Sequence, residues 1–158
     1  MNINWQKSAL FAIFLIGVNG CAITQNIKGP GETNINEKGG IPDNYKLVWA
    51  DEFDNIGMPA KDKWQFDTSR NKEGWYNNEL QYYAANRSKN VRIENGILTI
   101  EAHKEDLNQD DFTDWGGQKF TSGKITTDGI FSFTYGFVDV RAKLPCQTGS
   151  WPAIWTLF

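Results

Sequence analysis

The sequence is poor in the residues that most often build metal centres and catalytic triads. Its 158 residues include two cysteines and a single histidine, His103. This scarcity argues against a zinc site and against a triad of nucleophile, histidine and acid. Lysine and arginine are not in excess either, because 16 of them stand against 19 acidic residues, for a net charge of -3. Without a basic tract, the electrostatic footprint of a nucleic-acid-binding protein is missing, and we expect no nucleic acid partner.

The sequence also lacks an apolar run long enough for a membrane-spanning helix. Residues 8–18 are uncharged and largely apolar, but this run is too short to cross a bilayer. It is followed by Val-Asn-Gly-Cys, ending at Cys21, which resembles the lipoprotein box of bacteria. By that resemblance residues 1–20 are a lipoprotein signal peptide and Cys21 is the lipidated first residue of the mature protein. An ordinary signal peptide is the alternative, although its usual small-residue cleavage site is poorly matched here.

The lipoprotein resemblance implies a location as well as a modification. The protein would be exported and anchored through Cys21 to a bacterial (outer) membrane, in the periplasm or at the cell surface. Residues 21–44 are rich in Gly, Asn, Lys and Glu, and are interpreted as a flexible tether to a domain at 45–158. With Cys21 assigned to the lipid, Cys146 has no partner for an internal disulfide, so we interpret it as a loop thiol.

We expect Cys21→Ala to abolish labelling of the protein with palmitate, because the thiol that would carry the lipid is removed. Metabolic labelling of producing cells measures this. Cys146→Ala removes the other thiol and should label like the wild type. Palmitate on the Cys21→Ala protein would contradict the lipoprotein interpretation.

Aromatic residues are abundant. Seven Trp, five Tyr and ten Phe make up 14% of the chain. Aromatic faces pack against the apolar faces of sugar rings, so this abundance suits a carbohydrate-binding protein. Composition alone fits a Phe-rich all-β core equally well, and the motifs have to decide between the two.

From Tyr45 onward the pattern predicts short strands with turns between them and no helix. Asn95-Gly96 and Asp128-Gly129 are dipeptides that favour two-residue type I′ turns, and each predicts a hairpin. Nine strands at this spacing indicate an antiparallel sandwich, jelly roll or barrel. The longest surface loop is expected at Lys104 to Gln118. The predicted strands are Lys46–Ala50, Trp64–Thr68, Leu80–Tyr83, Val91–Glu94, Ile97–His103, Gly123–Thr127, Ile130–Thr134, Gly136–Leu144 and Trp151–Leu157.

The last two predicted strands combine charged and aromatic side chains. In an extended Gly136–Leu144 one face holds Phe137, Asp139, Arg141 and Lys143, and the other holds only apolar residues. In the following strand Trp151 and Trp155 share a face. Two indoles beside an acid, a base and an aromatic ring are suited to binding a sugar.

Six sequence blocks in a fixed order resemble glycoside hydrolase family 16, the laminarinase-like endo-β-glucanases. The resemblance implies an all-β fold, an antiparallel β-jelly-roll sandwich of the concanavalin A-like lectin/glucanase type, with a glycan cleft on its concave face. The blocks are Trp49 to Asp54, Asn78 to Tyr83, Asn90 to Arg92, Thr121 to Thr127, Tyr135-Gly136 with Val140 to Pro145, and Gly149 to Trp155.

The family resemblance also implies a catalytic motif, Glu-x-Asp-x-x-Glu, on the strand after the Trp-Pro-Ala-x-Trp block. Its two glutamates would serve as nucleophile and general acid/base, about 5 Å apart in a retaining enzyme. The pattern does not occur in the sequence, since Glu52-Phe53-Asp54 is not followed by the second glutamate. We therefore expect the catalytic residues after Phe158. The chain is interpreted as the N-terminal part of a jelly roll truncated before its catalytic strand, and as inactive alone.

Substrate-binding roles are implied by the resemblance for two groups of residues. Arg141 would hydrogen-bond sugar hydroxyls or keep the nucleophile ionised, with a surface salt bridge as the alternative. Trp151 and Trp155 would be stacking platforms, with a place in the core as the alternative for each.

Asn78 and Glu79 would approach the glycan from the cleft rim, and a turn with a solvated acid is the competing interpretation. Hydrolysis by two carboxyl groups requires no cofactor. A structural calcium ion is implied by the resemblance, with Glu52 and the backbone carbonyl of Gly96 as two ligands of an incomplete site; an exposed acidic loop is the alternative.

The sequence thus predicts the front portion of a secreted retaining endo-β-glucanase acting on β-1,3 or mixed β-1,3/1,4 glucans, monomeric when full length. Two alternatives stay open. A family 16 agarase or carrageenase would be expected to hold more basic residues for sulfate than Arg141 and Lys143. A non-catalytic glycan-binding lipoprotein would keep the tryptophans without the acid pair.

Overall fold

The computed structural model describes residues 10–14 and 44–157. Cys21, nearly all of the tether and most of the signal peptide lie outside the described residues, so those interpretations stay predictions. Of the residues assigned to the signal peptide, the structure describes Leu10–Phe14, which form strand β1.

The described residues form short strands and one 3₁₀ turn, η1 (Tyr76–Asn78). No helix among them is long and apolar enough to cross a membrane. The strands are β1 (Leu10–Phe14), β2 (Gln65–Phe66), β3 (Gln81–Tyr83), β4 (Val91–Glu94), β5 (Ile97–Ile100), β6 (His103–Lys104), β7 (Phe120–Ser122), β8 (Ile125–Thr126) and β9 (Ala153–Leu157).

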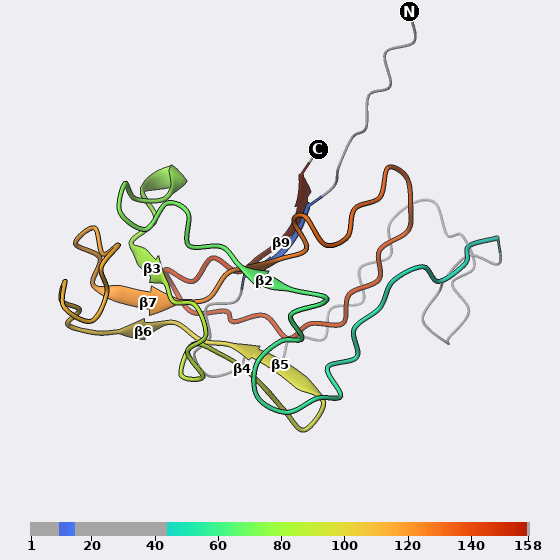
Figure 1. Cartoon of the computed structure of the whole chain (residues 1–158), viewed down its shortest axis with the longest axis horizontal. Helices are drawn as coiled ribbons and strands as arrows, with labels where there is room; N and C mark the ends of the chain where they lie inside the picture. The colour runs from blue at the N-terminus through green and yellow to red at the C-terminus, as the bar shows by residue number, and fades with distance from the viewer. Residues whose placement is uncertain (1–9, 15–43, 158) are drawn as a thin grey trace, which may run out of the picture.

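The strands pair into three sheets (Figure 1). The largest has the order β2-β8-β1-β9 and is antiparallel throughout. A second has the order β3-β7-β6, and its β3–β7 pair is parallel, which the all-antiparallel prediction did not include. The third is the hairpin β4-β5. The segment between β6 and β7 confirms the long surface loop.

The Asn95-Gly96 hairpin forms as predicted. Glu94 pairs with Ile97, and the two residues between them have φ of 54° and 72°, the left-handed values that a type I′ turn requires. The alternation on β4 also follows the sequence, because Val91 and Ile93 are fully buried while Glu94 is exposed.

Three predicted strands are wrong. Lys46–Ala50, Ile130–Thr134 and Gly136–Leu144 have no strand assignment in the part of the chain that the structure describes. Asp128-Gly129 still makes a turn, with the amides of Ile130 and Phe131 donating to the carbonyl of Thr127, but no second strand follows it. The second hairpin is therefore wrong as well.

These segments are not strands because they contact one another through aromatic side chains and not through backbone hydrogen bonds. Trp49 stacks on Phe131 with ring centroids 5.6 Å apart, and Tyr45 meets Phe137 edge to face at 6.0 Å. Figure 1 shows the segment after β8 running outward as a long loop. Among the residues that the structure describes, no strand pairs with Gly136–Leu144, and Val138 and Leu144 stay exposed on what the alternation assigned as its core face.

The core lies where the large sheet meets the β4-β5 hairpin. Its buried members are Trp64, Val91, Ile100 and Ile125, and Ile154 of β9 packs against them. Asp51 holds the indole of Trp64 by accepting its N–H at 2.8 Å, and its side chain also faces Lys63. The acid of the Trp-Ala-Asp-Glu block therefore has a structural role.

Gly123 is required by close packing. A Cβ at this position would lie 2.0 Å from Cγ2 of Val91 and 3.4 Å from Cγ2 of Ile100, both core residues. Contact at 2.0 Å is far inside van der Waals range, so a side chain there displaces the core.

We expect Gly123→Ala to destabilise the full-length protein by about 1–3 kcal/mol, the usual cost of overpacking a core. Thermal or urea unfolding measures the change. Ser132→Ala, at an exposed position, should unfold like the wild type. Equal stabilities for Gly123→Ala and wild type would show that Val91 has room to move.

Candidate functional site

Trp155 lies on the outer face of the large sheet. Successive residues of β9 point to opposite faces, so Ile154 packs on the core while the Trp155 side chain points away and is 40% exposed. The core alternative for Trp155 is thereby disfavoured. Trp151 lies in the segment before β9 and is 61% exposed.

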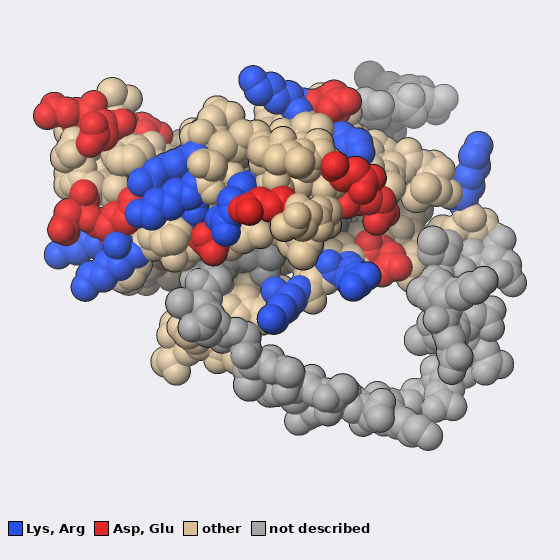
Figure 2. Space-filling model, turned by 90° about the horizontal axis from the view of Figure 1, so that it is seen from below, with Lys and Arg blue, Asp and Glu red and all other residues tan. Residues whose placement is uncertain are grey.

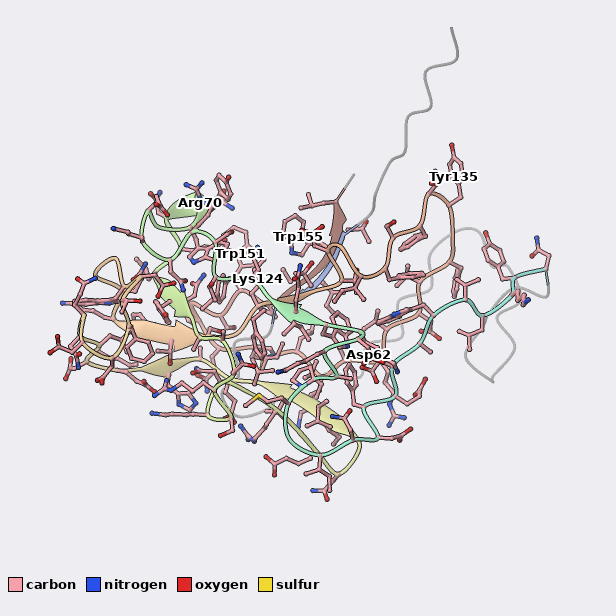
Figure 3. All side chains as sticks on the ribbon, viewed as in Figure 1. Asp62, Arg70, Lys124, Tyr135, Trp151 and Trp155 are labelled. Carbon is pink, nitrogen blue, oxygen red and sulfur yellow. The ribbon has the colours of Figure 1, made fainter. Side chains whose placement is uncertain are left out.

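Lys124 meets Trp155 on this face. Its neighbour Ile125 is fully buried in the core, so the lysine side chain leaves the strand on the opposite side. The Lys124 ammonium lies 5.7 Å from the centroid of the Trp155 ring and 4.4 Å from that of Trp75. Figure 3 shows Lys124 below Trp151 in that view, with Trp155 above and to the right of both.

The ammonium of Lys124 is paired with a carboxylate. Its Nζ lies 2.7 Å from Oδ2 of Asp67, and the two side chains are only 15% and 24% exposed. Burial of Asp67 opposes its ionisation, but hydrogen bonds from Lys124 and Ser69 outweigh that cost and lower the pKa of Asp67 below its ordinary value. Asp67 therefore stays ionised at neutral pH.

Trp75 is held by a buried amide. Asn71 is fully buried; its Oδ1 accepts the indole N–H of Trp75 at 3.2 Å and the backbone N–H of Tyr83 at 3.0 Å. Its Nδ2 donates to the Tyr83 carbonyl and to Oδ2 of Asp114, both at 3.0 Å. Asn71 thus ties the loop that carries Trp75 to strand β3.

Two tyrosines of β3 continue the polar network. The Tyr82 hydroxyl donates to Asp114 at 2.6 Å, and the Tyr83 hydroxyl donates to Glu79 at 3.3 Å. Burial and the adjacent carboxylate raise the pKa of each tyrosine well above its ordinary value. Both hydroxyls therefore remain protonated donors at physiological pH.

The contacts connect two of the residues expected from the sequence. Trp155 touches Lys124, Lys124 touches Trp75, Trp75 packs edge to face on Tyr83 at 4.6 Å, and Tyr83 donates to Glu79. Sequence reasoning missed the intermediate residues Trp75 and Lys124. The available signal was their position in the sequence, since Lys124 lies inside one of the six blocks and Trp75 lies three residues before another.

The other expected residues lie apart from this network. Arg141 is exposed in the loop that lacks strand pairing, and none of the ion pairs found among the described residues involves it. Asn78 is exposed at the end of η1 with a φ of 57°. Their roles toward a glycan stay predictions.

The calcium prediction gains no further ligand. Glu52 is exposed, Gly96 lies at the tip of the β4-β5 turn, and no group of three His, Cys, Asp or Glu side chains suited to a metal occurs in residues 44–157. Two ligands fall short of the six to eight oxygens that calcium takes, so the described residues do not fit the ion by themselves.

No family model matches the chain. It is 43% identical over 113 residues to a beta-glucanase from Rhodothermus marinus, covering 72% of this chain and 36% of that protein. It is 38% identical over 117 residues to glucan endo-1,3-beta-glucosidase A1 from Niallia circulans, covering 70% of this chain and 17% of that protein.

Among solved structures the chain is similar to SCLam, a non-specific endo-β-1,3(4)-glucanase from glycoside hydrolase family 16 that was co-crystallised with 1,3-β-D-cellobiosyl-cellobiose. The identity is 60% and the TM-score 0.58, over 61% of this chain and 38% of that one. This chain is a relative of the family 16 endo-β-glucanases. The chain spans little more than a third of SCLam and of the Rhodothermus protein.

The family 16 relationship confirms the fold class expected from the sequence. The strand-rich architecture belongs to the β-jelly-roll class of these glucanases. It also confirms the resemblance to glycoside hydrolases that rested on the six blocks, one of which contains Lys124.

We expect Asn71→Ala to destabilise the full-length protein by about 2–4 kcal/mol, because several buried hydrogen-bonding groups lose their partner at once. The indole of Trp75 should also become more accessible to acrylamide. Unfolding curves and fluorescence quenching measure these effects.

Asn55→Ala is the matched control, since it removes a single exposed hydrogen bond, from Asn55 to the Met58 carbonyl. It should cost less than about 1 kcal/mol. Similar losses for the two variants would contradict the role assigned to Asn71.

Proposed function

We propose that the protein carrying this chain is an exported endo-β-glucanase that cleaves internal β-1,3 or mixed β-1,3/1,4 linkages with retention of configuration. The observation that carries the proposal is the identity of 60% to SCLam, a structure determined with a glucan oligosaccharide at its active site. The names of the Rhodothermus and Niallia relatives support the same substrate class.

The described residues account for glycan binding in this proposal. An exposed indole on a sheet face gives a flat apolar surface for a pyranose ring, and Trp155 has that placement. Trp75 lies on the other side of Lys124, and Glu79 and Asn78 follow on the same loop. The nucleophile and the general acid/base are the two glutamates expected after Phe158.

The charges near the tryptophans favour a neutral glycan. Lys124 is neutralised by Asp67, and the Arg70 guanidinium lies over the Tyr76 ring at 4.5 Å while donating to the Gly74 carbonyl. Figure 2 views the molecule from below the view of Figure 1, and on that face too Lys and Arg lie beside Asp and Glu. Sulfated polysaccharides need unpaired cations, so an unsubstituted β-glucan is the better fit.

A sulfated or galactose-based substrate is the second candidate, in line with the agarase or carrageenase alternative. The observation that favours it is an identity of 32% over 117 residues to keratan-sulfate endo-1,4-beta-galactosidase from Sphingobacterium multivorum. The stronger identities to glucan-named relatives place it second.

Membrane attachment through Cys21, a periplasmic or cell-surface location and a monomeric state belong to the same proposal. Cleavage before Cys21 would remove β1, which pairs with β8 and β9, so on this proposal the large sheet of the mature protein forms without that strand. Support comes from the sequence, whose apolar run and Cys21 context are typical of lipoproteins. The calcium ion is not included in the proposal.

We expect the full-length protein to release reducing ends from laminarin and from mixed-linkage glucan, and to leave agarose and κ-carrageenan intact. The anomeric form of the first product, followed by NMR, should match that of the substrate, as double displacement requires. Residues 1–158 alone should release no sugar.

Each alternative has its own outcome. Release from agarose or carrageenan would favour the second candidate. Binding of laminarin without any new reducing ends would favour the non-catalytic glycan-binding protein and would contradict the hydrolase.

A further inference from the structure

The side chain of Lys124 is largely shielded from water, which destabilises the folded state unless the ammonium has a partner. Its side chain is only 15% exposed, and within residues 121–127 it is the one residue that is not buried. An ammonium taken out of water needs a fixed partner, and Asp67 supplies it at 2.7 Å.

Asp67 is itself held in position. Its carboxylate accepts the amide of Ser69 at 3.0 Å and the Ser69 hydroxyl at 2.7 Å, and its own amide donates to the Lys124 carbonyl at 3.0 Å. Asp67 therefore contacts Lys124 twice, through a hydrogen bond to its backbone carbonyl and through an ion pair with its ammonium.

The anchored ammonium reaches two indoles from distant parts of the chain. Trp75 precedes η1, and Trp155 lies on β9, eighty residues later. The faces of an indole carry negative potential, so an ammonium within about 6 Å of both rings attracts both. The distances of 4.4 Å and 5.7 Å meet that condition.

The two indoles differ in how else they are held. Trp75 has a hydrogen bond to Asn71 and an edge contact with Tyr83, whereas Trp155 is 40% exposed on a strand face. A large side chain exposed in this way samples several rotamers unless something attracts its ring. Lys124 is placed to select one of them.

We propose that Lys124 is a positioning residue: its ammonium orients the Trp155 indole against the fixed Trp75 and holds it ready for a glucan ring. The inference rests on the proposed function, because it assigns Lys124 to the glucan-binding face of that site. The residue acts through the two tryptophans and takes no part in bond cleavage.

The test uses the full-length protein and Lys124→Met, which replaces the side chain by an unbranched apolar one that is one atom shorter and carries no charge. The KM for laminarin should rise about 3- to 20-fold, the equilibrium factor that corresponds to a partly desolvated cation–π contact. kcat should stay within about twofold, since preorganisation of a binding face affects affinity. Lys124→Arg keeps the charge and should restore most of the KM.

Lys119→Met is the matched control. Lys119 is exposed on the loop before β7, and its backbone carbonyl accepts the Glu105 amide. Its substitution removes one positive charge without touching either indole, so its KM should equal that of the wild type.

Coupling to the indole separates positioning from a general loss of stability. In a Trp155→Phe background Lys124→Met should raise the KM much less than in the wild type. The reason is that a Phe ring at position 155 attracts an ammonium less strongly than an indole does. Equal effects in both backgrounds would overturn the proposal, and so would a wild-type KM for Lys124→Met.

A measurement without glucan distinguishes failure of this inference from failure of the proposed function. The indole N–H signals of Trp75 and Trp155 in ¹H–¹⁵N spectra should shift in Lys124→Met and return toward wild type in Lys124→Arg. Unshifted signals would overturn the positioning role whatever the protein binds. Shifted signals together with no binding or hydrolysis of laminarin by the wild type would instead overturn the proposed function and, with it, the assignment of Lys124 to a glucan site.

Discussion

A single buried segment, residues 120–127, contributes a strand to each of two sheets. β7 pairs with β3 and β6, and β8 pairs with β2 and β1, so the segment connects most of the described strands. Buried backbone groups must be hydrogen-bonded, and these two ladders satisfy the segment on both sides. Gly123 between the strands has no side chain because Val91 and Ile100 of the hairpin pack directly against it. Strands β1, β2, β3 and β6 are placed by pairing with this segment.

The candidate site is a consequence of the same segment. Because Ile125 is in the core, the strand pleat turns Lys124 to the opposite face, where Trp155 arrives by the same alternation on β9. The core and the aromatic face are thus two sides of one sheet. Asn71 then brings Trp75 to that face by bonding β3 and the indole with one amide. The packing of the core and the position of Lys124 therefore both depend on the strand that contains Ile125.

The names of the chain's relatives describe enzymes that act on glucans. In retaining glycosidases the carboxyl groups perform the chemistry, while positioned side chains determine where the sugar lies. We propose the second role for Trp75, Lys124, Trp155 and Glu79. Ring contacts and hydrogen bonds connect these four residues, although they lie far apart in the sequence.

Local sequence patterns predicted what depends on neighbouring residues. The Asn95-Gly96 turn and the alternation of Val91 and Ile93 with charged residues led directly to the β4-β5 hairpin, because turn conformation and pleat are local properties. The turn and the alternation survive in the structure because no distant partner is needed to specify them. The motif blocks predicted the jelly-roll class by resemblance, which the relatives confirm, and left both a stacking face and the core open for Trp155.

Pairing was decided by the tertiary structure alone. Gly136–Leu144 alternates as well as any strand in the chain, yet no strand lies beside it, and Arg141 therefore does not join the tryptophans through any contact found among the described residues. Conversely, nothing local marks Lys124 as the residue between two indoles, since Trp75 and Trp155 approach it from positions far away in the chain. The sequence by itself determined the turns, the apolar alternation and the family. The fold decided which strands pair and which side chains meet, because hydrogen-bond ladders and ring contacts require partners that only folding brings within reach.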